Sequence, residues 1–236
     1  MAERLIGRNE ARGVKLPRLA RSTGRGLTIG EVEGLARAAG DFGGDVIRTL
    51  AYTGMRWGEL AGLQVGDVDL VRARLMVRRA VVELGGAQIE TTPKTHRARL
   101  VPIVEPLAPM LAARVGGRRV SEPVFATSVG TPIRNSNFRK QVRWSELTES
   151  VGLSGLRLHD LRHTAASLMI ASGASVVEIA AVLGHSSSQT TLTIYAHLMQ
   201  DRLGDVSERM GQAIAGSYGQ NPATADHATR SDGVRG

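Results

Sequence analysis

Two histidines and two arginines stand close together in the stretch GLRLHDLRHTAASL, residues 155–168. The apolar spacing of this stretch predicts the start of a helix, so His159, Arg162 and His163 would lie close to the core. Three kinds of chemistry fit such a group: a metal site, a site for a phosphate group, or a cluster of hydrogen-bonded structural side chains.

The spacing of the two histidines suggests a metal site. His159 and His163 stand at i and i+4 on one helix face and resemble the HExxH motif of zinc proteases. Asp160 replaces the glutamate of that motif with a shorter acid, and Arg162 would bring a positive charge between the two ligands. No later Glu or His follows in a recognisable third-ligand pattern. We therefore predict no metal here and interpret Asp160 and His163 as structural support.

A phosphate site would need partners from elsewhere in the chain. His159 and Arg162 stand at i and i+3, so they would be neighbours on a helix. A guanidinium can donate several hydrogen bonds to phosphate oxygens, and an imidazole can donate one or move a proton. A phosphodiester under attack gains negative charge, which one arginine is rarely enough to hold. A second arginine, a nucleophile and an acid must then come from other blocks.

Two earlier blocks supply basic candidates. Arg56, in YTGMRWGEL, follows a glycine that breaks an apolar helix, although it could equally be a surface residue paired with Glu59. Lys94, in TPKTHRARLVPI, stands near the predicted tip of a hairpin. A lysine there is usually only solvated, but a hairpin tip can also carry an ammonium to a DNA strand as a proton donor.

Two later blocks supply a histidine and a tyrosine. His185, in LGHSS, follows Gly184, which is a good left-handed cap for the preceding helix. Tyr195, in TLTIYAHL, stands on an apolar helix, where a tyrosine is more often a core residue than a nucleophile.

Taken together and in this order, these blocks resemble the tyrosine recombinases, the phage-integrase family. The matching blocks span roughly residues 27–210, and their wording is most similar to integrases of bacterial phages and mobile elements. The resemblance carries the active-site set of the family onto six residues of this chain: Arg56, Lys94, His159, Arg162, His185 and Tyr195.

The resemblance implies a site-specific recombinase that cleaves and rejoins DNA. Tyr195 would attack the scissile phosphate and form a covalent 3′-phosphotyrosine. The two arginines would hold the non-bridging oxygens, and both histidines would hydrogen-bond the phosphate, with His159 a candidate acceptor of the tyrosine proton. Lys94 would protonate the leaving 5′-hydroxyl. The energy of the broken bond stays in the phosphotyrosine, so the resemblance implies neither a metal nor another cofactor.

The pattern along the chain predicts an α+β fold, a mainly helical catalytic domain with a small three-stranded antiparallel sheet. Thr28 and Glu31 fit a capping box that starts the first helix. Short β-branched segments, separated by turn signals such as Gly85-Gly86, predict the strands. The strand segments are 66–70, 73–84, 87–95 and 97–103, and the other helices are expected over 45–63, 105–115, 136–152, 155–168, 174–184, 190–198 and 202–215.

The ends of the chain differ in composition from its middle. Residues 1–26 are basic with scattered Gly and Pro, and are expected to be a linker and a remnant of the N-terminal core-binding domain of the family. Residues 27–215 form the expected catalytic domain, and 216–236 the expected disordered tail. A chain without the N-terminal domain would bind DNA weakly and with strong salt dependence. The alternative function is therefore a truncated or regulatory DNA-binding fragment.

Composition limits the partners and the setting. Of 236 residues, 30 are Lys or Arg and 22 are Asp or Glu, a net charge of +8, which favours a polyanionic partner such as double-stranded DNA. The chain has no cysteine, which excludes disulfides and thiolate metal sites, and no long apolar run indicates a membrane span. We expect a cytoplasmic protein, and the resemblance implies a bacterial one that joins other protomers as a tetramer on DNA. Four further arginines were weighed as phosphate contacts: Arg97, Arg99, Arg134 and Arg139.

Overall fold

The computed structural model describes residues 26–92 and 98–185, and then residues 189, 191–192, 208, 210–212 and 214–215. Lys94, Arg97 and Tyr195 lie outside the described residues, as do residues 1–25 and 216–236, so the expected linker and tail do too. In the helix expected over 202–215, the residues that are described are helical. None of the helices among the described residues is long and apolar enough to cross a membrane.

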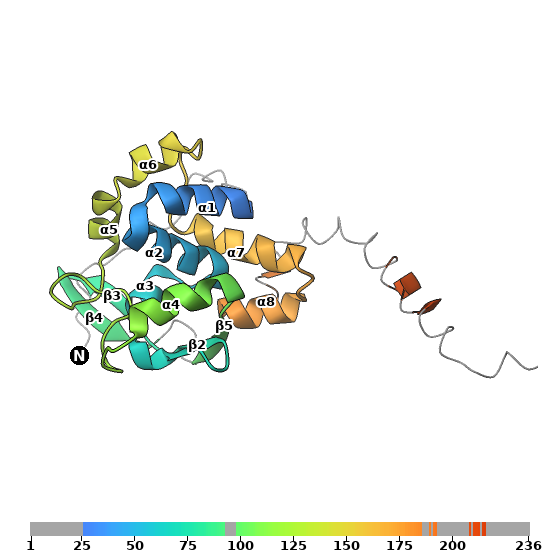
Figure 1. Cartoon of the computed structure of the whole chain (residues 1–236), viewed down its shortest axis with the longest axis horizontal. Helices are drawn as coiled ribbons and strands as arrows, with labels where there is room; N and C mark the ends of the chain where they lie inside the picture. The colour runs from blue at the N-terminus through green and yellow to red at the C-terminus, as the bar shows by residue number, and fades with distance from the viewer. Residues whose placement is uncertain are drawn as a thin grey trace, which may run out of the picture.

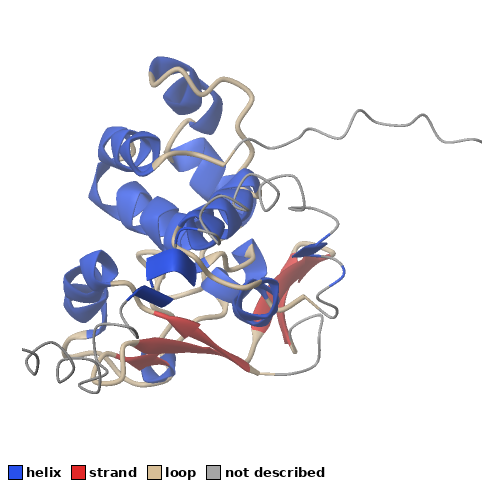
Figure 2. Cartoon of the chain, turned by 90° about the vertical axis from the view of Figure 1, so that its right-hand side faces the viewer, coloured by secondary structure: helices blue, strands red, loops and turns tan. Residues whose placement is uncertain are grey.

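The described body is α+β; many of its helices lie in the upper part of the molecule, and the strands lie in the lower part together with the remaining helices (Figure 1, Figure 2). The helices are α1 Ile29–Ala38, α2 Gly40–Thr53, α3 Trp57–Ala61, α4 Ala108–Val115, α5 Asn135–Gln141, α6 Trp144–Ser150, α7 Asp160–Ala171 and α8 Val176–Leu183. The strands are β1 Val68–Asp69, β2 Arg74–Val77, β3 Ala80–Leu84, β4 Ala87–Thr91 and β5 Arg99–Pro102. Short 3₁₀ turns stand at Val65–Asp67 and Glu105–Leu107.

The expected three-stranded antiparallel sheet is confirmed, in the order β1-β2-β5. The segment 73–84, expected as one strand, is two: β2 lies in the sheet, and β3 pairs with β4 in a separate hairpin. The break falls at Arg78 and Arg79, whose guanidinium groups both pair with the buried carboxylate of Asp67. Gly85 and Gly86 close the β3–β4 hairpin with positive φ angles of 57° and 82°, as a tight hairpin turn requires.

Local sequence signals fix several helix ends. The Thr28 side chain accepts from the Glu31 backbone, and the Glu31 carboxylate accepts from the Thr28 backbone, so the predicted capping box is present. Gly54 ends α2 and Gly184 ends α8, both in the left-handed conformation at φ 66° and φ 64°. These two glycines turn the chain where Arg56 and His185 follow.

The single helix expected over 136–152 is two helices, α5 and α6. Arg143 stands between them with φ 49°, which stops the first helix and redirects the second. The turn buries Trp144, whose indole N–H donates to the carbonyl of Leu156 at 2.7 Å and whose ring lies 6.5 Å from that of Phe138. Burial of a large aromatic side chain outweighs the cost of one strained backbone position.

Most of the core belongs to one apolar cluster, which holds α1, α2 and α4 against the sheet. A smaller cluster joins α7 to α8 and consists of Ala166, Ile170, Ile179 and Leu183. Because α7 packs on α2 on one side and on α8 on the other, it brings the ends of three elements to one place.

Candidate active site

Arg162 is the buried centre of the candidate site. Its side chain is in α7, and the residue is only 4% exposed. Nη1 donates to the carbonyl of Gly54 at 2.7 Å, and Nη2 donates to the carbonyl of Leu183 at 2.6 Å. The guanidinium therefore ties the C-terminal ends of α2 and α8 to α7 and places a fixed positive charge between them.

Arg56 stands at the start of α3, just after the turn at Gly54. Its Nη1 lies 3.0 Å from Oε1 of Glu59, and its Nη2 donates to the carbonyl of Gly184 at 3.3 Å. The side chain is 27% exposed, so the guanidinium reaches the surface. The sequence left open whether Arg56 belongs to a site or to a pair with Glu59; the structure shows the pair with Glu59 and a second bond that reaches the end of α8.

His185 follows the left-handed cap of α8. Its Nδ1 lies 2.7 Å from the hydroxyl of Thr191, a fully buried residue. Burial is the largest cause that lowers the pKa of His185 to about 4, and the charges of Arg162, Arg56 and Arg99 add to it, with His163 contributing least. The imidazole is therefore neutral at physiological pH, so one ring nitrogen carries a proton to donate and the other can accept.

His159 caps the N-terminal end of α7, one residue before the helix begins. Its ring lies edge-on to the ring of His163, with centroids 5.4 Å apart. The i and i+4 positions bring the two rings together, as expected for residues on one helix face. Burial, then the charges of His163 and Arg162, lower the pKa of His159.

The structure gathers three of the six predicted residues around the end of α8, Arg56, Arg162 and His185, and His159 lies three residues before Arg162 at the start of α7. Arg56 and Arg162 donate to consecutive carbonyls just before His185, and the charge of Arg162 acts on both histidines. Lys94 and Tyr195, the predicted proton donor and nucleophile, lie outside the described residues. The described part is thus a cradle of two cations and two neutral imidazoles.

Asp160 is a structural residue in the described site. It is buried, and its carboxylate accepts from the Arg157 backbone at 2.8 Å and from the Arg157 guanidinium at 2.7 Å. These bonds outweigh the effect of burial and hold the pKa of Asp160 below its ordinary value. Within the described ranges, no three His, Asp or Glu side chains lie close enough to hold a metal ion.

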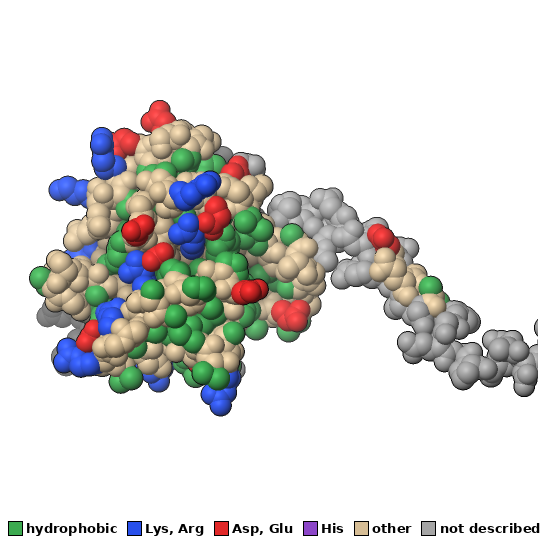
Figure 3. Space-filling view, viewed as in Figure 1, with side chains coloured by type: hydrophobic (Ala, Val, Ile, Leu, Met, Phe, Trp, Pro, Cys, Tyr) green, Lys and Arg blue, Asp and Glu red, His purple; other side chains and the backbone are tan. Residues whose placement is uncertain are grey.

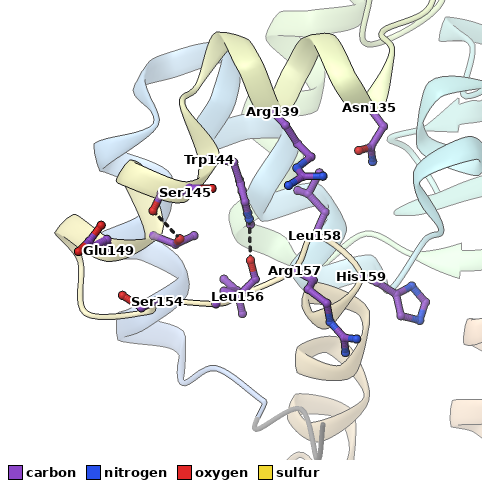
Figure 4. A pocket seen from close by; sticks show the side chains of 12 residues that line it. Asn135, Arg139, Trp144, Ser145, Glu149, Ser154, Leu156, Arg157, Leu158 and His159 are labelled. Carbon is purple, nitrogen blue, oxygen red and sulfur yellow. Dashed lines mark hydrogen bonds between the residues drawn. The ribbon is translucent and has the colours of Figure 1, made fainter. Parts of the chain in front are cut away.

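A pocket of about 600 Å³ opens beside His159, between α5, α6 and the loop that precedes α7 (Figure 4). Arg139, which is exposed, reaches it from α5, and Arg157 and His159 come from the loop side. The face drawn in Figure 3 carries interspersed acidic and basic side chains and shows no described histidine. His159, although exposed, is therefore not visible on this face.

Arg99 is not a phosphate contact, and the structure contradicts that interpretation. Its side chain is 9% exposed, and all three guanidinium nitrogens bond within the protein. Arg134 also has protein partners, the carbonyl of Gly86 at 2.8 Å and the carboxylate of Glu83 at 3.8 Å. Of the described arginines weighed for this role, Arg139 has the open position that the role needs.

The sequence did not reveal that Glu59 holds two arginines of the site region together. This carboxylate is 2% exposed and binds the side chains of both Arg56 and Arg99. The one available signal was its spacing of three residues from Arg56, which was weighed only as a surface pair. Arg99 carried no such signal, because its partners come from α3 and α8.

Comparison with known proteins decides the family. The model of the phage integrase family matches residues 44–202, which contain all six predicted site residues. The chain belongs to the phage integrase family. Within this family it is 33% identical to the tyrosine recombinase XerC of Corynebacterium efficiens over 212 residues, covering 84% of this chain and 62% of that protein.

Two further family members extend the comparison. The chain is 29% identical to the ICEBs1 integrase of Bacillus subtilis over 178 residues, 70% of this chain and 48% of that integrase. Its fold matches a structure of the Tn1549 transposon integrase in complex with transposon right end DNA, with a TM-score of 0.65 and 22% identity over 79% of this chain and 66% of that one. This integrase-family chain therefore spans roughly half to two thirds of the length of these relatives.

Proposed function

We propose that this chain is the catalytic part, residues 27–215, of a site-specific DNA recombinase that cleaves and rejoins double-stranded DNA through a 3′-phosphotyrosine. The observation that carries the proposal is the convergence of Arg56, Arg162 and His185 on one helix end, with His159 beside Arg162. Two fixed cations and two neutral imidazoles match the needs of a phosphodiester that gains negative charge. Membership of the phage integrase family supports the same reaction.

In the proposed reaction, the phenolic oxygen of Tyr195 attacks the scissile phosphorus. The bond from phosphorus to the tyrosine oxygen forms as the bond to the 5′-oxygen breaks, and Lys94 gives the leaving oxygen its proton. A tyrosine has a pKa of about 10, so it needs help to lose its proton at neutral pH. His159, whose pKa is lowered and which is therefore neutral, is the proposed acceptor of that proton.

The arginines stabilise the charge that develops on the non-bridging oxygens. Arg162 is buried and held by two carbonyls, so its charge needs no rearrangement when the phosphate arrives. Arg56 is held by Glu59 and Gly184 while its guanidinium stays open to the surface. A 5′-hydroxyl from a partner strand would reverse the step and release the tyrosine.

The proposed partners are DNA and other protomers of the same protein, assembled as a tetramer on DNA. The Tn1549 integrase was solved with DNA, which supports DNA as the substrate of this chain as well. The relatives are bacterial proteins, so the proposed setting is the bacterial cytoplasm, at the nucleoid.

A covalent-trapping experiment tests the proposal. The chain is incubated with a pool of suicide duplexes, each nicked so that the 5′-hydroxyl fragment diffuses away after cleavage. We expect a protein–DNA adduct that survives denaturation, forms equally with and without EDTA, and is lost in Tyr195→Phe. Retention of DNA without an adduct would support the DNA-binding fragment instead, and hydrolysis that EDTA abolishes would support a metal-dependent hydrolase that uses His159 and His163.

A further inference from the structure

Five successive carbonyls at the C-terminal end of α8 have hydrogen-bond partners, and the last three partners are arginines. The carbonyls of Ala180 and Ala181 accept from the backbone of His185 and Gly184, as in a Schellman motif. The next three carbonyls accept from guanidinium groups: Val182 from Arg99 Nε at 2.8 Å, Leu183 from Arg162 Nη2 at 2.6 Å, and Gly184 from Arg56 Nη2 at 3.3 Å.

The three arginines come from different elements, β5, α7 and the start of α3. A helix normally leaves its last carbonyls to water or to a single cap, and its C-terminal end attracts cations. Here the end of α8 is fixed by three separate parts of the fold, and His185 follows directly. Arg56, Arg162 and His185 belong to the proposed catalytic set, but Arg99 does not.

Glu59 links Arg99 to Arg56. Its Oε1 accepts from Arg56 Nη1 at 3.0 Å and from Arg99 Nη1 at 2.9 Å, and its Oε2 accepts from Arg99 Nη2 at 2.6 Å and from the Arg56 backbone at 2.8 Å. Burial by itself raises the pKa of Glu59, but the hydrogen bonds and charges of Arg99 and Arg56 outweigh it and lower the pKa. The carboxylate is thus ionised, buried and shared between two arginines.

Arg99 also packs directly against Gly184, the C-terminal cap of α8. A Cβ atom at Gly184 would meet the Cδ, Nε and Cζ atoms of Arg99 at 3.0 Å. Arg99 therefore touches both the residue that precedes His185 and the carboxylate that holds Arg56. It is packed beneath the cradle at 9% exposure and cannot itself face a DNA strand.

We propose that Arg99 is a positioning residue, which occupies Glu59 and the end of α8 so that Arg56 and His185 keep the geometry needed at the scissile phosphate. This proposal rests on the proposed function. An arginine and a carboxylate prefer a two-pronged pair. Without Arg99, Glu59 is open to both terminal nitrogens of Arg56, which draws Nη2 away from Gly184 and neutralises the charge meant for the phosphate.

Two single variants and one double variant test this role. Arg99→Met removes the guanidinium, and Arg99→Lys keeps the positive charge but loses the fork that bridges Glu59 and Val182. The double variant, Glu59→Gln with Arg99→Met, also removes the carboxylate that would capture Arg56. The matched control is Arg118→Met. Arg118 likewise pairs with a glutamate, Glu122, and donates to backbone carbonyls, but has no contact with α8.

The first readout is single-turnover adduct formation with suicide DNA, at a temperature where circular dichroism shows each variant folded. We expect Arg99→Met to lower the rate about 10- to 100-fold, with DNA affinity nearly unchanged, because the phosphate is bound but poorly aligned. The rate of adduct formation in Arg99→Lys should lie between the rates of Arg99→Met and the wild type. The rate of Arg118→Met should equal that of the wild type, and the rate of the double variant should exceed that of Arg99→Met. Equal rates in Arg99→Met and Arg118→Met, or a double variant slower than Arg99→Met, would overturn the proposal.

The second readout needs no DNA and no turnover. The pKa of His185 is followed by NMR in the wild type, Arg99→Met and Arg118→Met. The charges near His185 are Arg162, Arg56, Arg99 and His163. Loss of the Arg99 cation should raise this pKa, while Arg118→Met should leave it unchanged, and an unchanged pKa in Arg99→Met would contradict the placement of Arg99. If the wild type forms no adduct, the proposed function fails, whereas this titration still tests whether Arg99 lies beside His185 as described.

Discussion

Arg162 Nη1 lies 2.7 Å from the carbonyl oxygen of Gly54, a residue 108 positions earlier in the chain. The carbonyl is available because Gly54 adopts the left-handed conformation at the end of α2. The same glycine lies against Leu183 and Ala165, so α2, α7 and α8 meet at one small residue. The position of the buried arginine therefore depends on a glycine that has no chemistry of its own.

Gly54→Ala should destabilise the protein strongly. Its φ of 66° disfavours a side chain, and a Cβ atom would clash with Leu183 Cδ2 and meet Ala165 Cβ at 3.1 Å. The backbone strain and the overpacking together should lower the free energy of unfolding by about 3 kcal/mol. Urea unfolding followed by circular dichroism measures this change.

Gly152→Ala is the matched control for Gly54→Ala. Gly152 has a φ of 74°, but a Cβ atom there would meet nothing within 4 Å. Only the backbone strain should then appear, about 1 kcal/mol. Equal losses in the two variants would show that the contact of Gly54 with α7 and α8 has no energetic role.

Arg162→Lys should lose the reaction while keeping the fold. A lysine has the charge but cannot reach the carbonyls of Gly54 and Leu183 with two fixed donors. One carbonyl left without a partner should cost about 1–3 kcal/mol of stability. The rate of adduct formation should fall about 10²–10³-fold, the usual cost of removing one fixed donor from a transition state. An adduct rate near that of the wild type would contradict the role given to the Arg162 fork.

His185 should make stability depend on pH in a definite direction. Burial and the neighbouring cations lower its pKa from 6.5 to about 4, so the folded state disfavours its protonation. The stability that this effect provides is fully present above the unfolded pKa and is lost as the pH falls through the folded pKa of about 4. Urea unfolding between pH 7 and pH 4 should show a smaller loss in His185→Gln than in the wild type. The pKa values of His159 and His163 are also lowered, so part of the dependence of the unfolding free energy on pH should remain in the variant. The same pH dependence in the variant and the wild type would refute the assignment to His185.

Arg139→Gln should weaken DNA binding in a salt-dependent way. Arg139 is exposed and lines the pocket beside His159, which suits a contact to the DNA backbone. Loss of one phosphate contact should reduce the slope of log affinity against log salt by about 1, with little effect on sequence preference. Fluorescence anisotropy over a salt series measures the slope. The control is Arg119→Gln, which removes an exposed guanidinium that pairs with Glu122 away from this pocket. This control should leave the salt slope unchanged, and an equal reduction of the slope in both variants would refute the assignment to Arg139.

The local parts of the fold were predictable because their causes lie within a few residues. The capping box at Thr28, the left-handed glycines at 54 and 184 and the hairpin turn at 85–86 each depend on residue types at fixed spacing. The errors came where distant contacts decide the backbone. Arg143 breaks a predicted helix because Trp144 is buried, and Arg78 and Arg79 end a predicted strand because both pair with Asp67.

The sequence by itself determined the residue types of the site and the family, because the blocks around Arg56, His159, Arg162 and His185 are local patterns in a fixed order. Only the tertiary structure decided which side chains share a partner. Glu59 looked like a surface acid and Arg99 like a phosphate contact, yet Glu59 is buried and binds Arg99, and Arg99 in turn donates to the end of α8. Such bonds join residues that are far apart in the chain, and local spacing carries no record of them.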